Sequence, residues 1–130
     1  MCAAKTMTLL NRLAMRLHRE GEHRAALVLL GLALRESLRR QSLLHEAKIR
    51  NNVALVLALS GRRRLAQRQL ARALGLVARR VGCDNALFSL LQTNFHSVER
   101  VDLPRSGDNV RMCFDAGADD AKRRGQVLAA

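Results

Sequence analysis

The sequence has no tryptophan and no tyrosine, and it contains only three phenylalanines and one proline. Such a composition excludes the aromatic stacking platforms on which many proteins hold single-stranded nucleic acid. Valine, isoleucine, tyrosine and tryptophan favour strands, and their scarcity beside abundant leucine and alanine excludes an all-β fold. Hydrophobic residues make up 48% of the 130 residues, which indicates one folded domain rather than a wholly disordered chain.

Cysteine is also sparse, and long apolar runs are missing. Cys2, Cys83 and Cys113 form neither an even framework nor a CxxC pair, so a disulfide scaffold is excluded. The longest apolar run, Ala25 to Leu34, has ten residues and is too short to cross a bilayer. No secretory signal is visible at the start of the chain. These observations predict a cytoplasmic protein with reduced thiols and no membrane segment.

Acidic residues are in the minority. There are 11 Asp and Glu against 23 Lys and Arg, 20 of them Arg, for a net charge of +12. Residues 1–40 carry eight basic and three acidic residues, residues 41–81 carry nine and one, and residues 82–130 carry six and seven. The positive field over the first two segments would attract acidic peptides, nucleic acid or anionic lipid. The alternative is that these charges only solvate helix faces.

Apolar residues recur at helical spacing through most of the chain. The pattern predicts five helices, over residues 7–19, 23–40, 43–60, 63–81 and 84–100. The first has an apolar stripe of Leu9, Leu10, Leu13 and Leu17, and the last has one of Leu87, Leu91, Phe95 and Val98. Asp84 is placed to cap the last helix. Residues 102–130 lose this period, which predicts a mostly disordered tail with room for a short helix over 118–129.

A 40-residue repeat is the most informative pattern. Residues 11–40 and 51–80 share eleven of thirty positions, whereas this composition gives roughly three by chance. The repeated residues include Ala14, Leu17, Gly21, Ala26, Leu30, Ala33 and Leu34, which return as Ala54, Leu57, Gly61, Ala66, Leu70, Ala73 and Leu74. Small side chains let two helices approach closely, and glycine permits the turn between them. The repeat predicts helical hairpins that must stack to bury their apolar faces.

The repeated residues resemble the signature of the tetratricopeptide repeat (TPR) family, in its subclass of 40–42-residue units. A third, partial copy begins at Thr93-Asn94-Phe95, and the resemblance covers about residues 7–101. Leucine replaces the aromatic residues of the family, and no proline closes either unit. The resemblance implies an all-α, TPR-like α-solenoid over residues 1–101, with two helical hairpins and a C-terminal capping helix.

The resemblance also implies a concave groove lined by the first helix of each unit. Its residues would be Asn11, Arg12 and Met15 in the first unit, Lys48, Asn51, Asn52 and Leu55 in the second, and Thr93 and Asn94 in the third. An asparagine amide both donates and accepts hydrogen bonds, so it suits the main chain of a bound peptide. Arg12 and Lys48 would favour an acidic ligand.

A second surface is predicted on residues 23–40. Val28, Leu29 and Leu32 stand where the second unit has Arg68, Gln69 and Arg72. A helix that is apolar all round is usually buried all round, so these three residues predict self-association, as in a homodimer. The alternative is that the N-terminal residues or the tail, through Val110, Met112 and Phe114, fold over them.

Catalytic sets are missing from the sequence. The four histidines lie far apart, no HExxH, GxGxxG, GxSxG or Walker loop occurs, and Cys83 has no base near it in sequence. We therefore expect no enzyme, no metal and no cofactor. The predicted function is a protein–protein interaction module, an adaptor or small chaperone. The alternative is a basic helical protein that binds nucleic acid through the arginine stripe at 62–80.

Overall fold

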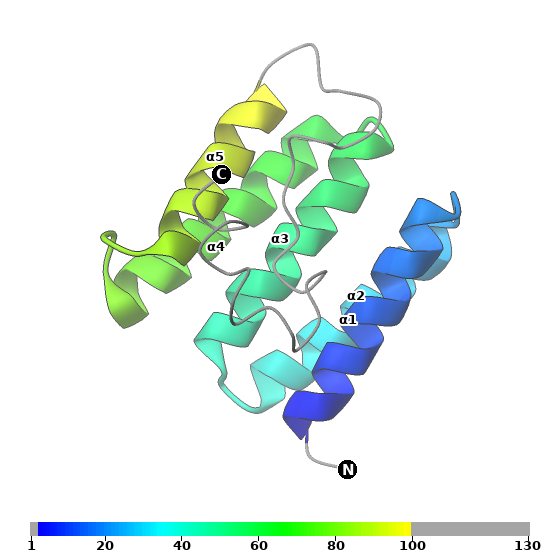
Figure 1. Ribbon diagram of the computed structural model, residues 1–130, viewed down its shortest axis with the longest axis horizontal. Coiled ribbons are helices and arrows are strands. Elements are labelled where there is room, and N and C mark those ends of the chain that lie inside the picture. The colour runs from blue at the N-terminus through cyan, green and yellow to red at the C-terminus, as the bar shows by residue number, and fades with distance from the viewer. Residues whose placement is uncertain (1–2, 100–130) are drawn as a thin grey trace.

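The computed structural model describes residues 3–99 and is all-helical over that range (Figure 1). The five helices are α1 (Ala3–Arg19), α2 (His23–Arg39), α3 (Leu43–Leu59), α4 (Arg63–Val81) and α5 (Ala86–Glu99), and no strand occurs among the described residues. The predicted all-α class and all five predicted helices are confirmed. The tail predicted over 102–130 lies outside the described residues. No described helix is long and apolar enough to cross a bilayer.

The turns inside the two hairpins are copies of each other. In the first, the N–H of Glu22 donates to the carbonyl of Leu17 at 2.8 Å, and in the second the N–H of Arg62 donates to that of Leu57 at 2.7 Å. Each turn passes through a glycine with positive φ, Gly21 at 86° and Gly61 at 88°. This conformation closes a helix end by pairing its last carbonyls, and glycine adopts it without a steric penalty.

The ends of two helices differ from the prediction. Helix α1 begins at Ala3, four residues earlier than expected, because Ala4 and Lys5 are themselves good helix formers. Helix α5 is capped by Asn85 and not by Asp84, whose side chain is exposed. The N–H of Phe88 donates to Asn85 Oδ1, and Asn85 Nδ2 donates to the carbonyl of Gly82, both at 2.8 Å. An asparagine amide can donate one hydrogen bond and accept another, whereas an ionised aspartate carboxylate can only accept.

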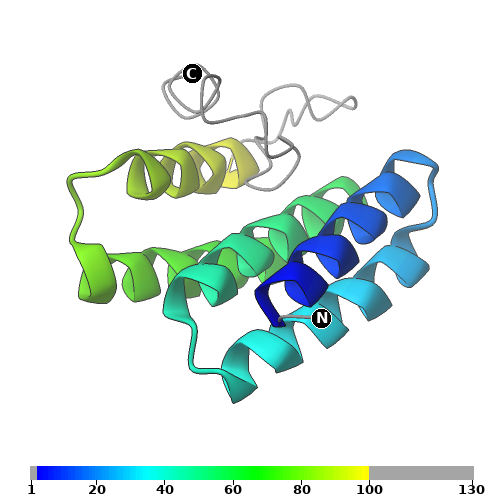
Figure 2. The ribbon, with the colours of Figure 1, turned by 60° about the horizontal axis from the view of Figure 1, so that its bottom comes forward.

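The helices follow one another across the molecule from α1 and α2 at one end to α5 at the other (Figures 1 and 2). Helix α1 packs on α2 and α3 packs on α4, while α2 also contacts α3 and α4 contacts α5. The first helices meet as well, since α1 contacts α3 and α3 contacts α5. The repeated small residues Ala14, Ala26, Ala54 and Ala66 are all buried, as predicted for helix interfaces.

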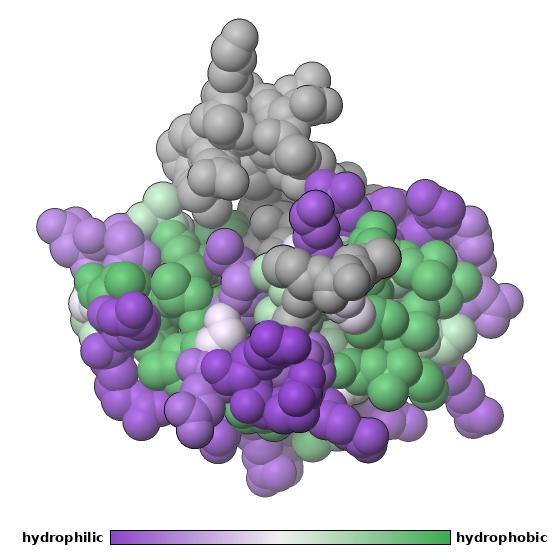
Figure 3. Space-filling model, turned by 90° about the horizontal axis from the view of Figure 1, so that it is seen from below, coloured by the Kyte–Doolittle hydropathy of each residue, from purple (hydrophilic) through white to green (hydrophobic). Residues whose placement is uncertain are grey.

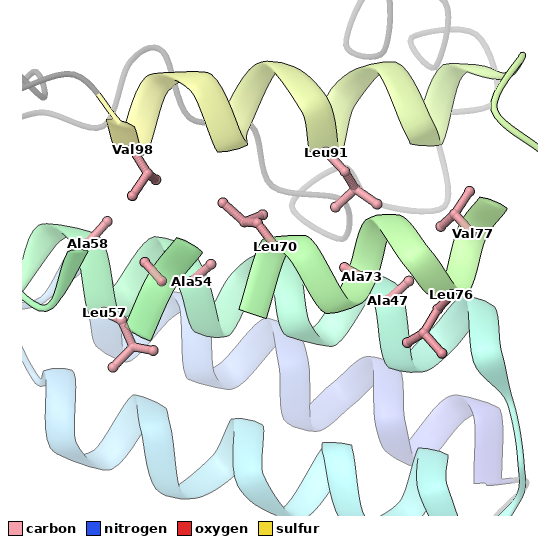
Figure 4. Close-up of a cluster of buried hydrophobic side chains, with 11 residues drawn as sticks. Ala47, Ala54, Leu57, Ala58, Leu70, Ala73, Leu76, Val77, Leu91 and Val98 are labelled. Carbon is pink, nitrogen blue, oxygen red and sulfur yellow. The ribbon is translucent and has the colours of Figure 1, made fainter. Parts of the chain in front are cut away.

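The apolar core forms two clusters. In one, Leu91 and Val98 of α5 point toward α3 and α4, where Leu70 is buried, while Leu57 and Leu76 point away from α5 (Figure 4). Leu87 and Phe95 pack against the same cluster, so the predicted stripe of α5 is confirmed. The other cluster joins the first hairpin to α3 through residues that include Met15, Leu30 and Ile49.

Helix α1 confirms only half of its predicted leucine stripe. Leu9 is 51% exposed and Leu13 is 45% exposed, whereas Ala14, Met15 and His18 are buried. Leu10 and Leu17 pack against the cluster that joins the first hairpin to α3, whereas no described helix covers Leu9 and Leu13. Periodicity identifies an apolar side but not the element that covers it.

Candidate functional site

Four asparagines meet where α1, α3 and α5 lie next to one another. Asn52 Nδ2 donates to Asn11 Oδ1 at 2.9 Å, and Asn94 Nδ2 donates to Asn51 Oδ1 at 2.7 Å. A longer contact of 3.5 Å joins Asn51 Nδ2 to Asn52 Oδ1. All four side chains are fully buried. We call this set the asparagine ladder; it ties the three first helices together with amide hydrogen bonds.

The two short bonds of the ladder are the same bond in successive repeats. Asn51 follows Asn11 by 40 residues, and Asn94 follows Asn52 by 42. In both bonds the donor, Asn52 or Asn94, stands one repeat position after its acceptor, and the acceptor belongs to the preceding unit. At the first unit the position of Asn52 is held by Arg12, and at the third unit the position of Asn51 is held by Thr93. Both residues are exposed. The ladder is therefore a property of the repeat and of how its units stack.

One atom of the ladder has no partner. Asn11 Nδ2 is buried and makes no hydrogen bond to any of the described residues 3–99. A buried donor without an acceptor costs about 1–3 kcal/mol, and such groups in native proteins usually have a specific reason. The ladder thus ends, on α1, in a buried N–H donor with no acceptor among the described residues.

The structure separates the predicted groove residues into two groups. Six of them are buried: Asn11, Met15, Asn51, Asn52, Leu55 and Asn94. Of the other three, Arg12 and Thr93 are exposed and Lys48 is half-buried. The asparagines are thus engaged with one another rather than displayed along an open groove. The spacing of 41 residues between Asn11 and Asn52 is the sequence signal that could have indicated this pairing.

A buried ion pair within α3 is linked to α4 by further polar contacts, and the sequence did not lead us to expect it. Glu46 and Arg50 are both buried, and Arg50 Nε donates to Glu46 Oε2 at 2.7 Å. Arg50 Nη1 also donates to Gln69 Oε1 at 2.7 Å, and Arg72 Nε lies 3.5 Å from Glu46 Oε2. The i, i+4 spacing of Glu46 and Arg50 was the available signal. This network holds the second hairpin together beside its apolar core.

Two histidines meet across the first turn. His18 Nδ1 and His23 Nδ1 are 2.9 Å apart, so one nitrogen carries the proton and the other accepts it. Burial, followed by the nearby charges of His23 and Arg19, lowers the pKa of His18. Within the described residues no group of three or more His, Cys, Asp or Glu is arranged to hold a metal ion.

The outer side of α4 carries charge of one sign. Between Glu46 and Asp84 the sequence has no acidic residue. The predicted stripe of Arg64, Arg68, Arg72 and Arg79 is exposed, as expected. Protein surfaces that serve only solubility usually mix both signs, so this surface attracts anionic groups.

Comparison with known proteins adds no relative, since no protein-family model, curated protein or solved structure matches the chain. The argument from repeats therefore depends on the chain itself. Its units share the glycine turn, at Gly21 and again at Gly61, and the ladder bond, donated once by Asn52 and once by Asn94.

Proposed function

We propose that the chain is a short TPR-like solenoid that binds a partner protein and has no enzymatic activity. The proposal is supported by three features that recur after one unit: sequence identity, the glycine turn and the ladder bond. Repeat proteins of this kind bury a continuous core between units and use their extended surfaces for binding. The cytoplasmic location stays a prediction.

The contacts between helices indicate which side would receive the partner. Helix α1 contacts α3, and α3 contacts α5, whereas α2 and α4 do not contact each other in the described part of the chain. An array whose first helices are close and whose second helices are apart curves toward the first helices. We place the binding face on this inner layer of α1, α3 and α5.

The observation that carries the proposal is the repeated ladder bond, which holds α1, α3 and α5 together as one inner layer. The ladder asparagines themselves are fully buried, so a partner would contact the exposed side chains beside them. Arg12, exposed on α1, and Lys48, half-buried on α3, would favour a peptide with acidic side chains. The partner we expect is therefore an acidic segment of another protein.

A displayed library of acidic and neutral peptides tests this assignment. We expect the wild-type chain to enrich acidic peptides, and Arg12→Glu/Lys48→Glu to lose that enrichment while its circular dichroism is unchanged. Arg64→Glu, which makes the same charge change on the outer side of α4, is the matched control and should enrich like wild type. Equal enrichment by all three proteins would contradict a binding face on the inner layer.

Nucleic-acid binding is a second candidate because α4 exposes five arginines, four of them in the predicted stripe, and has no acidic residue. Arginine pairs well with phosphate, and four phosphate contacts would give a slope of about −3.6 for log K against log salt. Binding to random-sequence duplex DNA would then weaken about 150-fold between 50 and 200 mM salt. Removing Arg64 and Arg68 should reduce the slope by about two. A slope near zero would dismiss this candidate.

A further inference from the structure

One end of the array presents an uncovered apolar face. We call it the α1–α2 end face and define it by Leu9 and Leu13 of α1 and by Val28 and Leu32 of α2. Their exposed fractions are 51%, 45%, 64% and 44%. Figure 3 shows a large hydrophobic patch on its right-hand side, where α1 and α2 lie in Figure 1. Single exposed leucines are ordinary, but four on two adjacent helices form a patch.

The repeat shows what such a face receives. Leu9 corresponds by the 40-residue shift to Ile49, and Leu13 corresponds to Val53. Ile49 is buried and Val53 is half-buried, and both pack in the cluster that joins α3 to the first hairpin. The same repeat position is therefore covered by a helical hairpin in the second unit. In the first unit no described helix lies over it.

The two units also differ in the chemistry around this position. The ion network of the second unit consists of Glu46, Arg50, Gln69 and Arg72, and its equivalents in the first unit are Thr6, Leu10, Leu29 and Leu32. Leu10 and Leu29 pack against the cluster around α3, whereas Leu32 lies exposed on the end face where the second unit has Arg72. The exchange suits a surface that packs against another apolar surface.

The exposed side of α5, at the opposite end of the array, is polar and does not match this face in a head-to-tail stack. The exposed side of α5 carries Ser89, Gln92, Thr93 and His96, as expected for the cap of a repeat array. An α1–α2 end face packed on that surface would bury polar groups without matching partners. The apolar match for this face within the described chain is the same face on a second copy, in a closed two-fold pair.

We propose that α2 packs antiparallel against α2 of a second copy through a self-complementary row of side chains. Arg24, Val28, Leu32 and Glu36 follow each other at four-residue intervals and so form one ridge of the helix. The antiparallel register that places Val28 on Leu32 of the second copy also places Arg24 on Glu36 of the second copy. Two apolar contacts are then flanked by two ion pairs.

Glu36 is available for this pairing in its charged form. Its carboxylate accepts hydrogen bonds from Arg39 and Arg40. A carboxylate has about four lone-pair sites, so a further guanidinium can approach. The inference concerns the α1–α2 end face alone and does not depend on the partner proposed for the inner layer.

Sedimentation equilibrium of the full chain in reducing buffer tests the apolar part of the interface. We expect a monomer–dimer equilibrium for the wild type, and a dissociation constant raised at least about 100-fold in Val28→Lys/Leu32→Lys. Leu65→Lys, at an apolar residue of α4 with a similar exposure of 43%, should leave the constant unchanged. A wild-type chain that is monomeric at about 1 mM would overturn the proposal, as would a dimer indifferent to the double substitution.

Charge exchange tests the register. Arg24→Glu and Glu36→Arg should each weaken self-association about tenfold or more, because each places like charges opposite each other. A mixture of the two variants should recover the dimer, because each heterodimer regains two opposite-charge pairs. Arg64→Glu, at the position of α4 equivalent to Arg24, is the control and should dimerise like wild type. Failure of the mixture to associate, with both variants folded, would exclude this register.

Discussion

Breaking the bond between Asn52 and Asn11 should have unequal effects depending on which side is removed. Asn52→Ala leaves Asn11 Oδ1 buried without a donor, and Asn11 Nδ2 stays without an acceptor. The lost acceptor pairing costs about 1–3 kcal/mol, and the space left by the amide adds to it. We expect Asn52→Ala to lower the free energy of unfolding by about 2–4 kcal/mol.

Asn11→Ala breaks the same bond but should cost much less. It leaves Asn52 Nδ2 without an acceptor, which costs about 1–3 kcal/mol, and it deletes the unpartnered Asn11 Nδ2, which recovers a similar amount. What remains is the cost of the space left by the amide, so the expected net loss is about 1 kcal/mol. The expected difference in unfolding free energy between the two variants follows from the unpartnered Nδ2 atom of Asn11.

Urea unfolding followed by far-ultraviolet circular dichroism measures both variants and the double variant on the full chain. The double-mutant cycle should show a coupling of about 1–3 kcal/mol between Asn11 and Asn52. Thr93→Ala, at an exposed position of α5, is the control and should change stability by less than about 0.5 kcal/mol. Equal losses for the two single variants, or a coupling below about 0.5 kcal/mol, would refute the ladder as described.

Three further predictions concern the remaining parts of the structure. Glu46→Ala leaves Arg50 buried without its carboxylate and should destabilise the chain by about 3–5 kcal/mol. The double variant Glu46→Thr/Arg50→Leu copies the residues of the first unit and should cost far less. Urea unfolding compares the two. Because burial lowers the pKa of His18 below 6.5, the unfolded chain binds a proton first as the pH falls. Stability should therefore drop between pH 7.5 and 5.5, and His18→Gln should show a smaller drop; identical pH profiles would contradict this. Gly75 lies in the middle of α4 with open space where a Cβ would stand, so Gly75→Ala should raise the free energy of unfolding by about 0.5–1 kcal/mol. Gly61 has a φ of 88°, so Gly61→Ala should lower the free energy of unfolding by about 1–2 kcal/mol. The reverse order of stabilities in thermal melts would be inconsistent with the turn geometry.

The helices and their interfaces were predictable because their signals are local. Leucine spacing placed α2 to α5 within three residues of their observed ends. The recurrence of Ala14 and Ala26 as Ala54 and Ala66 marked close helix contacts, and all four are buried. Such small residues have no alternative role that the sequence would confuse with packing.

The asparagines were misread because their partners are distant in sequence. A polar amide on a helix is normally expected to face water, and only the stacking of two units brings Asn52 to Asn11 across 41 residues. Two leucines of α1 were misread for a related reason. Their period is helical, but whether Leu9 and Leu13 are covered depends on which unit precedes them in the array.

The most direct test of the binding proposal is a chemical-shift map of the ¹⁵N-labelled chain with the acidic peptide that it enriches most. The account predicts that backbone amides of α1 and α3, including those of Arg12 and Lys48, show the largest changes. Asn94, whose amide donates to Asn51 within the ladder, should change little. Changes concentrated on α4 around Arg64 and Arg68, with the amides of Arg12 and Lys48 unmoved, would contradict a binding face on the inner layer.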